Sequence, residues 1–341
     1  MSAGATGVEG AGGVATEDLS MREALGAALA GALAADPTVL LLGEDLADPG
    51  GGISQVTKGL STTFGTDRVR DTPISEAAIV GAAVGAAVSG LRPVAELMIM
   101  DFISIALDQL VNHAAKARYM SGGLLSVPLT LRTAVFGGIG SGATHSQTLE
   151  AWLAHIPGLK VVVPSTPADA KGLLTSCIFD DDPCVFVENV ALYGTRGPVP
   201  TGDHRVPLGR AAVVRPGRDV TLVAYGRTVR DALAAAEQLA AEGIEVEVVD
   251  LRSLVPFDAE TVLASAARTR RVVVAHHATR FAGFGAEVAA VIGEELFGTL
   301  EAPVRRVGAA FAPIGSADVL EAAVMPSAAS LVAAVRSVAG A

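Results

Sequence analysis

Short apolar runs alternate with helical patterns along almost the whole chain, and this alternation restricts the fold more than any other feature of the sequence. Parallel strands need a crossover between them, and that crossover is usually a helix. The pattern therefore predicts parallel α/β architecture. We expect strands at 38–42, 93–98, 127–134, 159–163 and 184–188 in the first half, and at 220–225, 246–250, 271–276 and 304–307 in the second.

A stretch rich in proline and glycine at 193–207 separates the two series of strands. A chain of 341 residues suits two domains of ordinary size. We therefore expect domains at 19–195 and 211–341, joined by a linker at 196–210. The first 17 residues lack the basic start and apolar run of a secretory signal, and we expect a flexible tail at 1–18.

Composition narrows the classes of partner. The net charge of −11 argues against nucleic acid and anionic membranes. We expect no membrane span, because the most apolar helix, at 77–89, is too short. Cys177 and Cys184 are too few for a disulfide framework, which favours a reduced, cytoplasmic setting.

One predicted helix, within DTPISEAAIVGAAVGAAVSG at 71–90, consists almost entirely of small apolar residues. Pro73 interrupts the preceding chain, Ser75 can cap the helix, and Glu76 falls in its first turn. Neighbours can approach such a helix closely from all sides, so we expect it to be buried. A buried carboxylate needs a partner or undergoes a rise in its pKa. The alternative is that Glu76 complements the helix dipole at the surface.

Five segments, in this order, resemble the β chain of the decarboxylating first component of thiamine-diphosphate-dependent 2-oxoacid dehydrogenases. Acetoin dehydrogenase β chains are similar too. The segments are LLGEDLADPGGGISQVTKGL at 41–60, the Glu76 segment, GLRPVAELMIMDFISIALDQLVNHAAKARYMSGG at 90–123, THSQTLEAWLAHIPGLKVVVPSTPADAKGLL at 144–174 and DVTLVAYG at 219–226. The resemblance implies a transketolase-like pyrimidine-binding α/β domain with a mostly parallel sheet, followed by a smaller transketolase C-terminal α/β domain.

The same resemblance implies a place for the aminopyrimidine of thiamine diphosphate. This cofactor reacts through C2, and its activation requires a carboxyl group facing the pyrimidine N1′. By resemblance Glu76 is that group. Met98 and Phe102 line the pyrimidine pocket in the family, with Phe102 as the stacking aromatic; simple core packing is the alternative. Glu44 matches a carboxylate near the channel that joins paired active sites, or is a solvated loop acid.

The loop GGIGSGATHSQ contains neither a Walker P-loop nor a dinucleotide fingerprint. It places His145 on flexible backbone. In the family this histidine faces the thiazolium side, where it can polarise the substrate carbonyl or take part in acyl transfer. The alternative is a histidine that caps the next helix.

The family also often holds a potassium ion through main-chain carbonyls. The positions that align with this site are Leu129, Cys177, Ile178, Asp180 and Asp182. Backbone ligation leaves no side-chain pattern, so only the alignment points to it.

The chain lacks the Gly-Asp-Gly motif with which thiamine enzymes hold the diphosphate through Mg²⁺. We therefore expect a separate α subunit to supply that half of the site, in an α₂β₂ heterotetramer. The second domain departs from the family pattern at 276–279 (HHAT) and at 309–319 (AAFAPIGSADV). These departures put in doubt the docking of a lipoyl acyltransferase core, and another acyl carrier is an alternative acceptor.

The resemblance implies an oxidoreductase that acts on the aldehyde or oxo group of donors, active only with its α subunit. The expected reaction is oxidative decarboxylation of a 2-oxoacid with acyl transfer to lipoamide or another carrier. Oxidative cleavage of acetoin is the first alternative. A non-catalytic assembly subunit is an alternative from another class.

Overall fold

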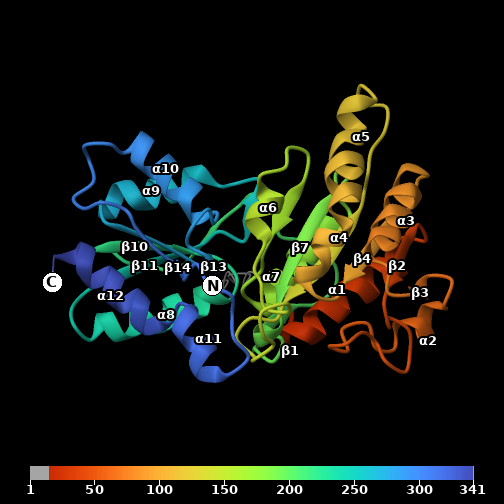
Figure 1. Cartoon of the computed structure of the whole chain (residues 1–341), viewed down its shortest axis with the longest axis horizontal. Coiled ribbons are helices and arrows are strands. Elements are labelled where there is room, and N and C mark those ends of the chain that lie inside the picture. Colours follow the sequence, from red (N-terminus) through yellow and green to blue (C-terminus); the bar gives the residue numbers. More distant parts are fainter. Residues whose placement is uncertain (1–14, 341) are drawn as a thin grey trace, which may run out of the picture.

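Two sheets, one in each half of the chain, organise the part that the computed structural model describes, residues 15–340 (Figure 1). The larger sheet has seven strands, parallel except for one at its edge. In spatial order they are β12 (Ser253–Val255), β6 (Lys160–Val162), β7 (Cys184–Asn189), β5 (Thr130–Val135), β4 (Arg92–Leu97), β2 (Val39–Gly43) and β3 (Val69–Asp71).

Helices cover both faces of this sheet, as its mostly apolar strands require. Leu41 of β2 points to one face and packs with α1 (Met21–Ala35) and α7 (Pro167–Ile178). The next residue, Leu42, lies in the core on the opposite face, with α3 (Glu76–Val88) and α4 (Ile103–Asp108). The predicted parallel α/β fold is confirmed.

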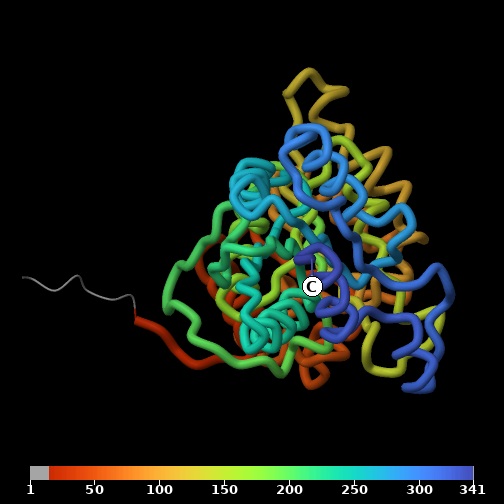
Figure 2. Tube along the Cα trace, turned by 90° about the vertical axis from the view of Figure 1, so that its left-hand side faces the viewer, coloured from red at the N-terminus to blue at the C-terminus, as the bar shows by residue number. Residues whose placement is uncertain are grey.

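The single helix expected at 102–119 is interrupted in its hydrogen-bonding pattern. It comprises η1 (Met100–Phe102), α4, the π-helical segment η2 (Gln109–Ala114) and α5 (Ala115–Met120). A π-turn shifts the register of the following turn, so side chains beyond it face a different direction. The end of α5 and the loop after it project from the molecule (Figure 2).

The second sheet has five strands in the order β14 (Arg305–Ala309), β13 (Val272–Thr279), β10 (Val220–Ala224), β11 (Val246–Asp250) and β9 (Ala212–Arg215). Only β9 runs antiparallel to its neighbour. One face packs on α8 (Arg227–Ala240) and α12 (Ala328–Ala339). The other packs on α9 (Ala259–Thr269) and α10 (Gly285–Glu295).

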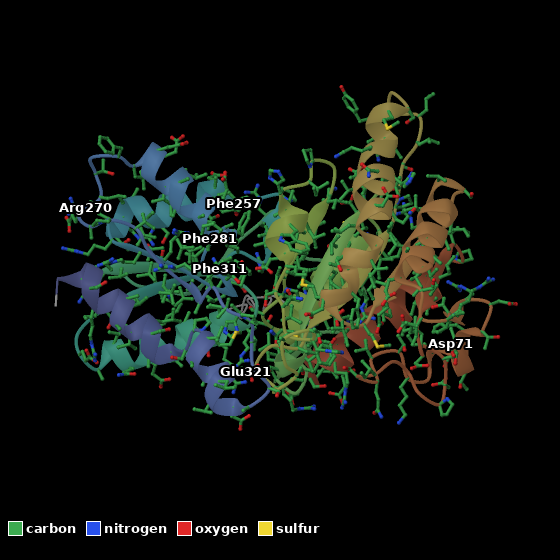
Figure 3. All side chains as sticks on the ribbon, in the orientation of Figure 1. Asp71, Phe257, Arg270, Phe281, Phe311 and Glu321 are labelled. Carbon is green, nitrogen blue, oxygen red and sulfur yellow. The ribbon has the colours of Figure 1, made fainter. Side chains whose placement is uncertain are left out.

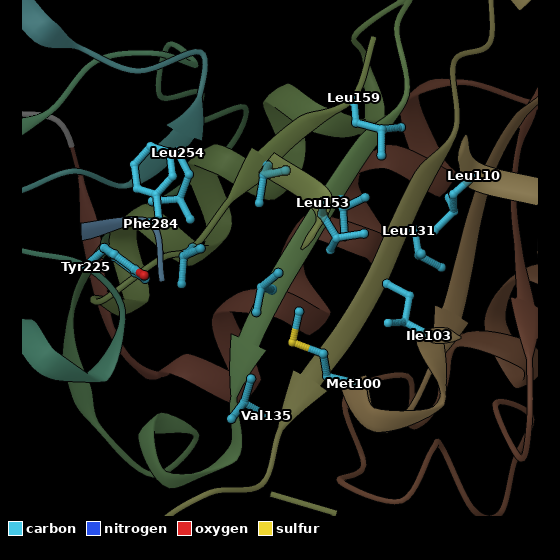
Figure 4. Packing of buried hydrophobic residues seen from close by; sticks show 14 of the residues in the cluster. Met100, Ile103, Leu110, Leu131, Val135, Leu153, Leu159, Tyr225, Leu254 and Phe284 are labelled. Carbon is cyan, nitrogen blue, oxygen red and sulfur yellow. The ribbon is translucent and has the colours of Figure 1, made fainter. Parts of the chain in front are cut away.

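A strand and a hydrophobic cluster join the two halves of the chain, which the sequence did not predict. Strand β12 follows β11 of the second sheet but pairs with β6 of the first. One hydrophobic cluster joins Tyr225, Leu254 and Phe284 from the second half to Leu153 and Leu159 from the first (Figure 4). The two domains are therefore continuous through a common core.

Two expected irregular segments contain strands. β1 (Thr16–Ser20) pairs antiparallel with β8 (Arg196–Pro200). The prediction of a tail is therefore wrong for residues 16–18, and the linker begins with a strand. Residues 1–14 of the expected tail lie outside the described residues. The pairing brings Thr16–Ser20 beside the segment that connects the domains, the red and green traces of Figure 2.

By length and composition, Asp318–Ala339 could cross a membrane, which the sequence analysis did not anticipate. This stretch consists of two helices, α11 (Asp318–Val324) and α12, separated around Pro326. Leu331 and Val335 of α12 are fully buried in the core of the second domain. That packing is typical of a core helix in a globular domain. Three short helices complete the described chain: α2 (Leu60–Phe64), α6 (Glu150–Ala154) and η3 (Val190–Leu192).

Candidate active site

The predicted site residues follow the carboxyl ends of neighbouring parallel strands. Glu44 comes directly after β2, Met98 directly after β4, and His145 lies in the loop after β5. Glu76 begins α3, which follows β3. Parallel strands end at the same edge of a sheet, and ligands in α/β proteins bind along this edge.

Glu76 is only 8% exposed, although Ile74 and Ser75 beside it face solvent. Within residues 15–340 its carboxylate has no hydrogen bond or ion pair. Ser75 occupies the N-cap position, but the capping hydrogen bond that we expected from its side chain is absent from this described helix end. A nearly buried carboxylate without a protein partner is costly unless something else satisfies it.

Helix α3 is buried on one side only, contrary to the expectation of complete burial. Ile79, Val80 and Ala83 face the core. On the other side, Ala82 and Gly85 are exposed, as are two residues of the first turn. The described chain thus presents a face of small side chains next to Glu76.

Glu44 and Glu76 lie close enough to interact electrostatically. Partial burial raises the pKa of Glu44, and the neighbouring carboxylates of Glu76 and then Asp45 raise it further. Two acids that repel one another at a sheet edge favour a nearby positive charge. The structure therefore brings together these two predicted residues.

Phe102 and His145 form a second pair. Their ring centroids are 5.4 Å apart and the rings meet edge to face, at 84°. The hydroxyl of Thr144 lies 3.0 Å from His145 Nδ1. Met98, the third predicted lining residue, is half-buried and borders a small cavity together with Glu96 and Arg132.

Beside the Phe102–His145 pair lies a polar contact that the sequence analysis missed. Asp101 is 6% exposed, and its Oδ1 accepts hydrogen bonds from Gln147 Nε2 at 2.8 Å and Gln147 N at 3.3 Å. This contact ties the chain after His145 to the helix that carries Phe102. Asp101 stands next to Phe102 in the sequence, so it was visible, but nothing there identified its partner.

A buried ionic network beneath the sheet edge was also missed. Arg132 of β5 donates to Glu96 Oε2 at 2.5 Å and to both oxygens of Glu188, at 2.7 and 3.0 Å. Tyr193 donates to Glu188 at 2.5 Å. Burial raises the pKa of Glu96, and Arg132 opposes that rise. An arginine inside an apolar strand was the available signal, because such a charge requires buried carboxylates.

The carbonyls proposed to bind potassium accept hydrogen bonds from protein donors. Arg92 Nη1 donates to the carbonyls of Ile178 and Asp180, at 3.4 and 2.9 Å. The carbonyl of Leu129 accepts from Cys184 N at 2.9 Å, and that of Cys177 accepts from Asp180 N at 3.2 Å. The carboxylate of Asp182 pairs with Arg118 and Lys160. A carbonyl has two lone pairs, so the potassium site stays a prediction.

No group of three or more His, Cys, Asp or Glu side chains in the described part of the chain is arranged to hold a metal ion. Of the carboxylates at this sheet edge, Glu96 pairs with Arg132 and Asp101 accepts from Gln147, whereas Glu44 and Glu76 repel one another. The geometry at this edge therefore provides an acid, an aromatic ring and a histidine.

Comparison with known families agrees with this architecture. Residues 17–195 match the transketolase pyrimidine-binding domain, and residues 209–331 match the transketolase C-terminal domain. The inactive β₄ tetramer of a split-gene transketolase has a similar structure, with a TM-score of 0.78 and 27% identity over 94% of this chain and 98% of that one. Transketolase from Leishmania mexicana shares the fold, with a TM-score of 0.70 at 21% identity, over 96% of this chain and 46% of that one.

Relatives found by sequence similarity identify a narrower family than the fold does. The acetoin:2,6-dichlorophenolindophenol oxidoreductase subunit beta of Cupriavidus necator is 46% identical, over 93% of this chain and 96% of that protein. The mitochondrial pyruvate dehydrogenase E1 component subunit beta-2 of Oryza sativa subsp. japonica is 44% identical, over 92% and 84%. The 2-oxoisovalerate dehydrogenase subunit beta of Pseudomonas aeruginosa is 44% identical, over 85% and 86%.

The fold and the two matched domains define a transketolase-like protein with a pyrimidine-binding domain and a C-terminal domain. Within that class, the chain belongs to the family of E1 β subunits, together with those of the pyruvate, acetoin and 2-oxoisovalerate dehydrogenases.

Proposed function

We propose that this chain is the β subunit of a thiamine-diphosphate-dependent dehydrogenase that oxidatively decarboxylates a 2-oxoacid and transfers the acyl group to lipoamide or another carrier. The observation that carries the proposal is Glu76, a carboxylate only 8% exposed that has no partner within the described residues. It lies at the sheet edge where ligands of this fold class bind. A cofactor held between two subunits would satisfy it.

The residues at this edge fit an aminopyrimidine. Glu76 would donate its proton to a ring nitrogen or share it there, and its burial would strengthen that hydrogen bond. The ring of Phe102 would stack on the pyrimidine, and its edge-to-face contact with His145 holds the histidine nearby. When bound, the cofactor would supply a nucleophilic carbon for the substrate carbonyl. His145 would donate a hydrogen bond or a proton to the oxygen of that carbonyl.

The diphosphate half of the site belongs, in this proposal, to an α subunit that also holds Mg²⁺. The sequence has no Gly-Asp-Gly, and a diphosphate requires such a clamp. The similar split-gene transketolase tetramer of β chains alone is inactive. The exposed small-residue face of α3 beside Glu76 would allow a second subunit to approach closely. We propose an α₂β₂ assembly, active only when both chains are present, with potassium as an optional structural ion.

Acetoin is a second candidate substrate, because the acetoin oxidoreductase β subunit of Cupriavidus necator is 46% identical to this chain. Assays of the assembled enzyme with an artificial electron acceptor would compare pyruvate, branched-chain 2-oxoacids and acetoin.

We further propose a cytoplasmic location, which the two unpaired buried cysteines support. The acyl acceptor in this proposal is a lipoyl acyltransferase core or another acyl carrier, because the second domain departs from the family pattern at 276–279 and 309–319.

The decisive test is Glu76→Gln in the assembled enzyme. This isosteric change keeps the size of the side chain but removes the acid, so we expect normal folding and a loss of turnover of about a hundredfold or more. Glu287→Gln is the matched control, since Glu287 lies in the first turn of α10 but faces solvent. Steady-state turnover and circular dichroism of both variants would be measured.

Near-normal turnover of Glu76→Gln would refute the proposed role of this acid. Binding of thiamine diphosphate separates the catalytic proposal from a pure assembly subunit. The β chain with its α partner should bind the cofactor, and Glu76→Ala should weaken that binding. An assembly subunit would show cofactor binding that does not depend on residue 76.

A further inference from the structure

The loop that carries His145 has little structure of its own. Gly138, Gly140 and Gly142 all have positive φ, at 96°, 76° and 79°. Among the described residues, the loop's own backbone hydrogen bond is His145 N to Gly142 O, at 3.3 Å. Glycines lose the most conformational freedom on folding. A loop of this composition is ordered only if contacts from outside hold it.

The second domain provides such contacts through Glu321 of α11. One carboxylate oxygen accepts from Gly138 N at 2.6 Å and the other from Gly140 N at 3.1 Å. Glu321 lies more than 180 positions further along the chain, at separations of 183 and 181 residues. Its side chain is 7% exposed and lies where the second domain meets the first (Figure 3). Two converging backbone N–H groups form a small anion-binding nest, which the carboxylate fills.

The fit around this nest is close. Arg227 Nη1 donates to the carbonyl of Gly137 at 3.3 Å, and it would lie only 1.5 Å from a Cβ placed on Gly138. A Cβ on Gly140 would lie 3.1 Å from the carbonyl oxygen of Ser316. The positive φ therefore favours glycine at position 138, and a side chain there would also displace the guanidinium of Arg227. The loop therefore receives two side chains from the second domain, Glu321 and Arg227.

None of the ion pairs of the described residues includes Glu321. Its hydrogen-bonding capacity is directed at the glycine loop. A carboxylate in contact with backbone N–H groups forms charge-assisted hydrogen bonds, which are stronger than neutral ones. The other end of the loop is held from the first domain, by Gln147 on Asp101.

We propose that Glu321 is a positioning residue that clamps the glycine-rich loop across the domain boundary and so holds His145 in its reactive place. The inference rests on the function proposed for His145. It assigns to the second domain a direct part in shaping the site on the first. Glu321 acts through the loop and does not touch the reacting atoms.

Hydrogen–deuterium exchange on the full chain tests the clamp without any cofactor. In Glu321→Ala we expect the amides of 136–145 to exchange at least about tenfold faster, while the core strands of both domains are unchanged. Glu242→Ala is the matched control, because Glu242 lies in the same domain and pairs with Arg336 at the surface. Unchanged exchange in the loop of Glu321→Ala would overturn the proposal.

Glu321→Gln keeps the clamp testable should the alanine variant fold poorly. Its amide offers one oxygen and turns an N–H₂ group towards the second glycine N–H, so we expect faster exchange mainly at one of Gly138 and Gly140. If both glycine amides stay as protected as in the wild type, the carboxylate is not what holds the loop.

Turnover of the assembled enzyme tests the link to His145. A misplaced histidine lowers kcat, by up to about a hundredfold, while KM for the substrate stays within about twofold. In a His145→Gln background, Glu321→Ala should cause no further loss, because both changes remove the same function. An equal loss in both backgrounds, or full turnover with a loosened loop, would overturn the positioning role.

The two proposals fail in different ways. If His145→Gln is as active as the wild type, the role proposed for that histidine is wrong. The exchange rates of the loop in the β chain alone would still decide whether Glu321 holds it.

Discussion

At the scale of single residues, Arg132 is a charge buried almost completely inside a sheet. Its side chain is 3% exposed and lies between the carboxylates of Glu96 and Glu188, which are 12% and 1% exposed. Charges so far from water are tolerated only when each is paired and hydrogen-bonded. The network binds three neighbouring strands, β4, β5 and β7, directly beneath the sheet edge that carries Met98. It therefore fixes these three strands relative to one another below the predicted site residues.

Removing the arginine should leave two buried carboxylates unpaired. We expect Arg132→Met to lower the free energy of unfolding by roughly 3–5 kcal/mol. Arg118→Met is the control: Arg118 pairs with Asp182 at the surface, where such pairs contribute about 0–1 kcal/mol. Urea denaturation of the two variants would be compared with the wild type, and equal effects would contradict the structural role of Arg132.

His276 is a second residue whose burial has a measurable consequence. It is fully buried, its ring stacks on Tyr225 with centroids 5.8 Å apart, and Gly283 and Gly285 pack against it. Burial lowers the pKa of His276 from 6.5 to about 4, opposed by a hydrogen bond with the carbonyl of Ala278. The folded protein therefore keeps this ring neutral over a range in which the unfolded chain protonates it.

The sign of the resulting pH dependence follows. Between pH 6.5 and about 4 the unfolded state binds the extra proton, so His276 makes the folded state less stable as the pH falls. Relative to His276→Gln, the wild type should lose about 3 kcal/mol of unfolding free energy over this window and show no change above it. Urea denaturation from about pH 4 to about pH 7.5 would measure both proteins. Parallel curves would contradict the prediction.

At the scale of elements, α3 combines a buried acid with an exposed face made of small residues. Helix surfaces that carry only Ala and Gly let a neighbouring backbone approach closely, and they offer no charge to be satisfied in a monomer. Gly85 has open space where a Cβ would lie. In the proposed assembly, this face would receive the subunit that completes the site.

A large charged residue should block that approach without harming the fold. We expect Ala82→Arg to change the free energy of unfolding by no more than about 0.5 kcal/mol and to abolish association with the α subunit. Ala234→Arg on α8, at another exposed alanine, should leave association unchanged. Copurification of each variant with the α subunit would measure this. A complex of normal yield with Ala82→Arg would exclude α3 from the interface.

At the scale of the whole molecule, the two domains fold around a shared core. Strand β12 joins the sheet of the first domain, although both strands before it along the chain belong to the second. Leu254 of this strand is fully buried in the cluster that contains side chains of both halves. Separate unfolding of the domains would expose that cluster from both sides, so it is disfavoured.

Leu254→Ala should therefore destabilise both domains together. We expect a loss of about 2–5 kcal/mol, as for other large-to-small changes in cores. Hydrogen exchange of β2 and β10 should accelerate by the same factor. Leu29→Ala, in a cluster confined to the first domain, should affect β2 more than β10 if the domains retain partial independence. Unequal acceleration in Leu254→Ala would contradict a common core.

Much of the fold was predictable because its determinants are local. Short, mostly apolar runs separated by helical patterns predicted parallel sheets, and the small-residue helix with Glu76 at its start was visible as a segment. The π-turn at Gln109–Ala114 was not predictable, because its sequence reads as an ordinary continuation of the helix. Strand β12 was missed for a similar reason, since three residues carry no period.

Residue types and their order along the chain were enough to identify the family, the acid at residue 76 and the missing diphosphate motif. These are properties of short segments, and each segment carries its own pattern. Only the tertiary structure decided that Arg132 lies between Glu96 and Glu188, and that Glu321 reaches the glycine loop. Such contacts join positions far apart in the chain, and their energy arises from burial and geometry that exist only after both domains have packed.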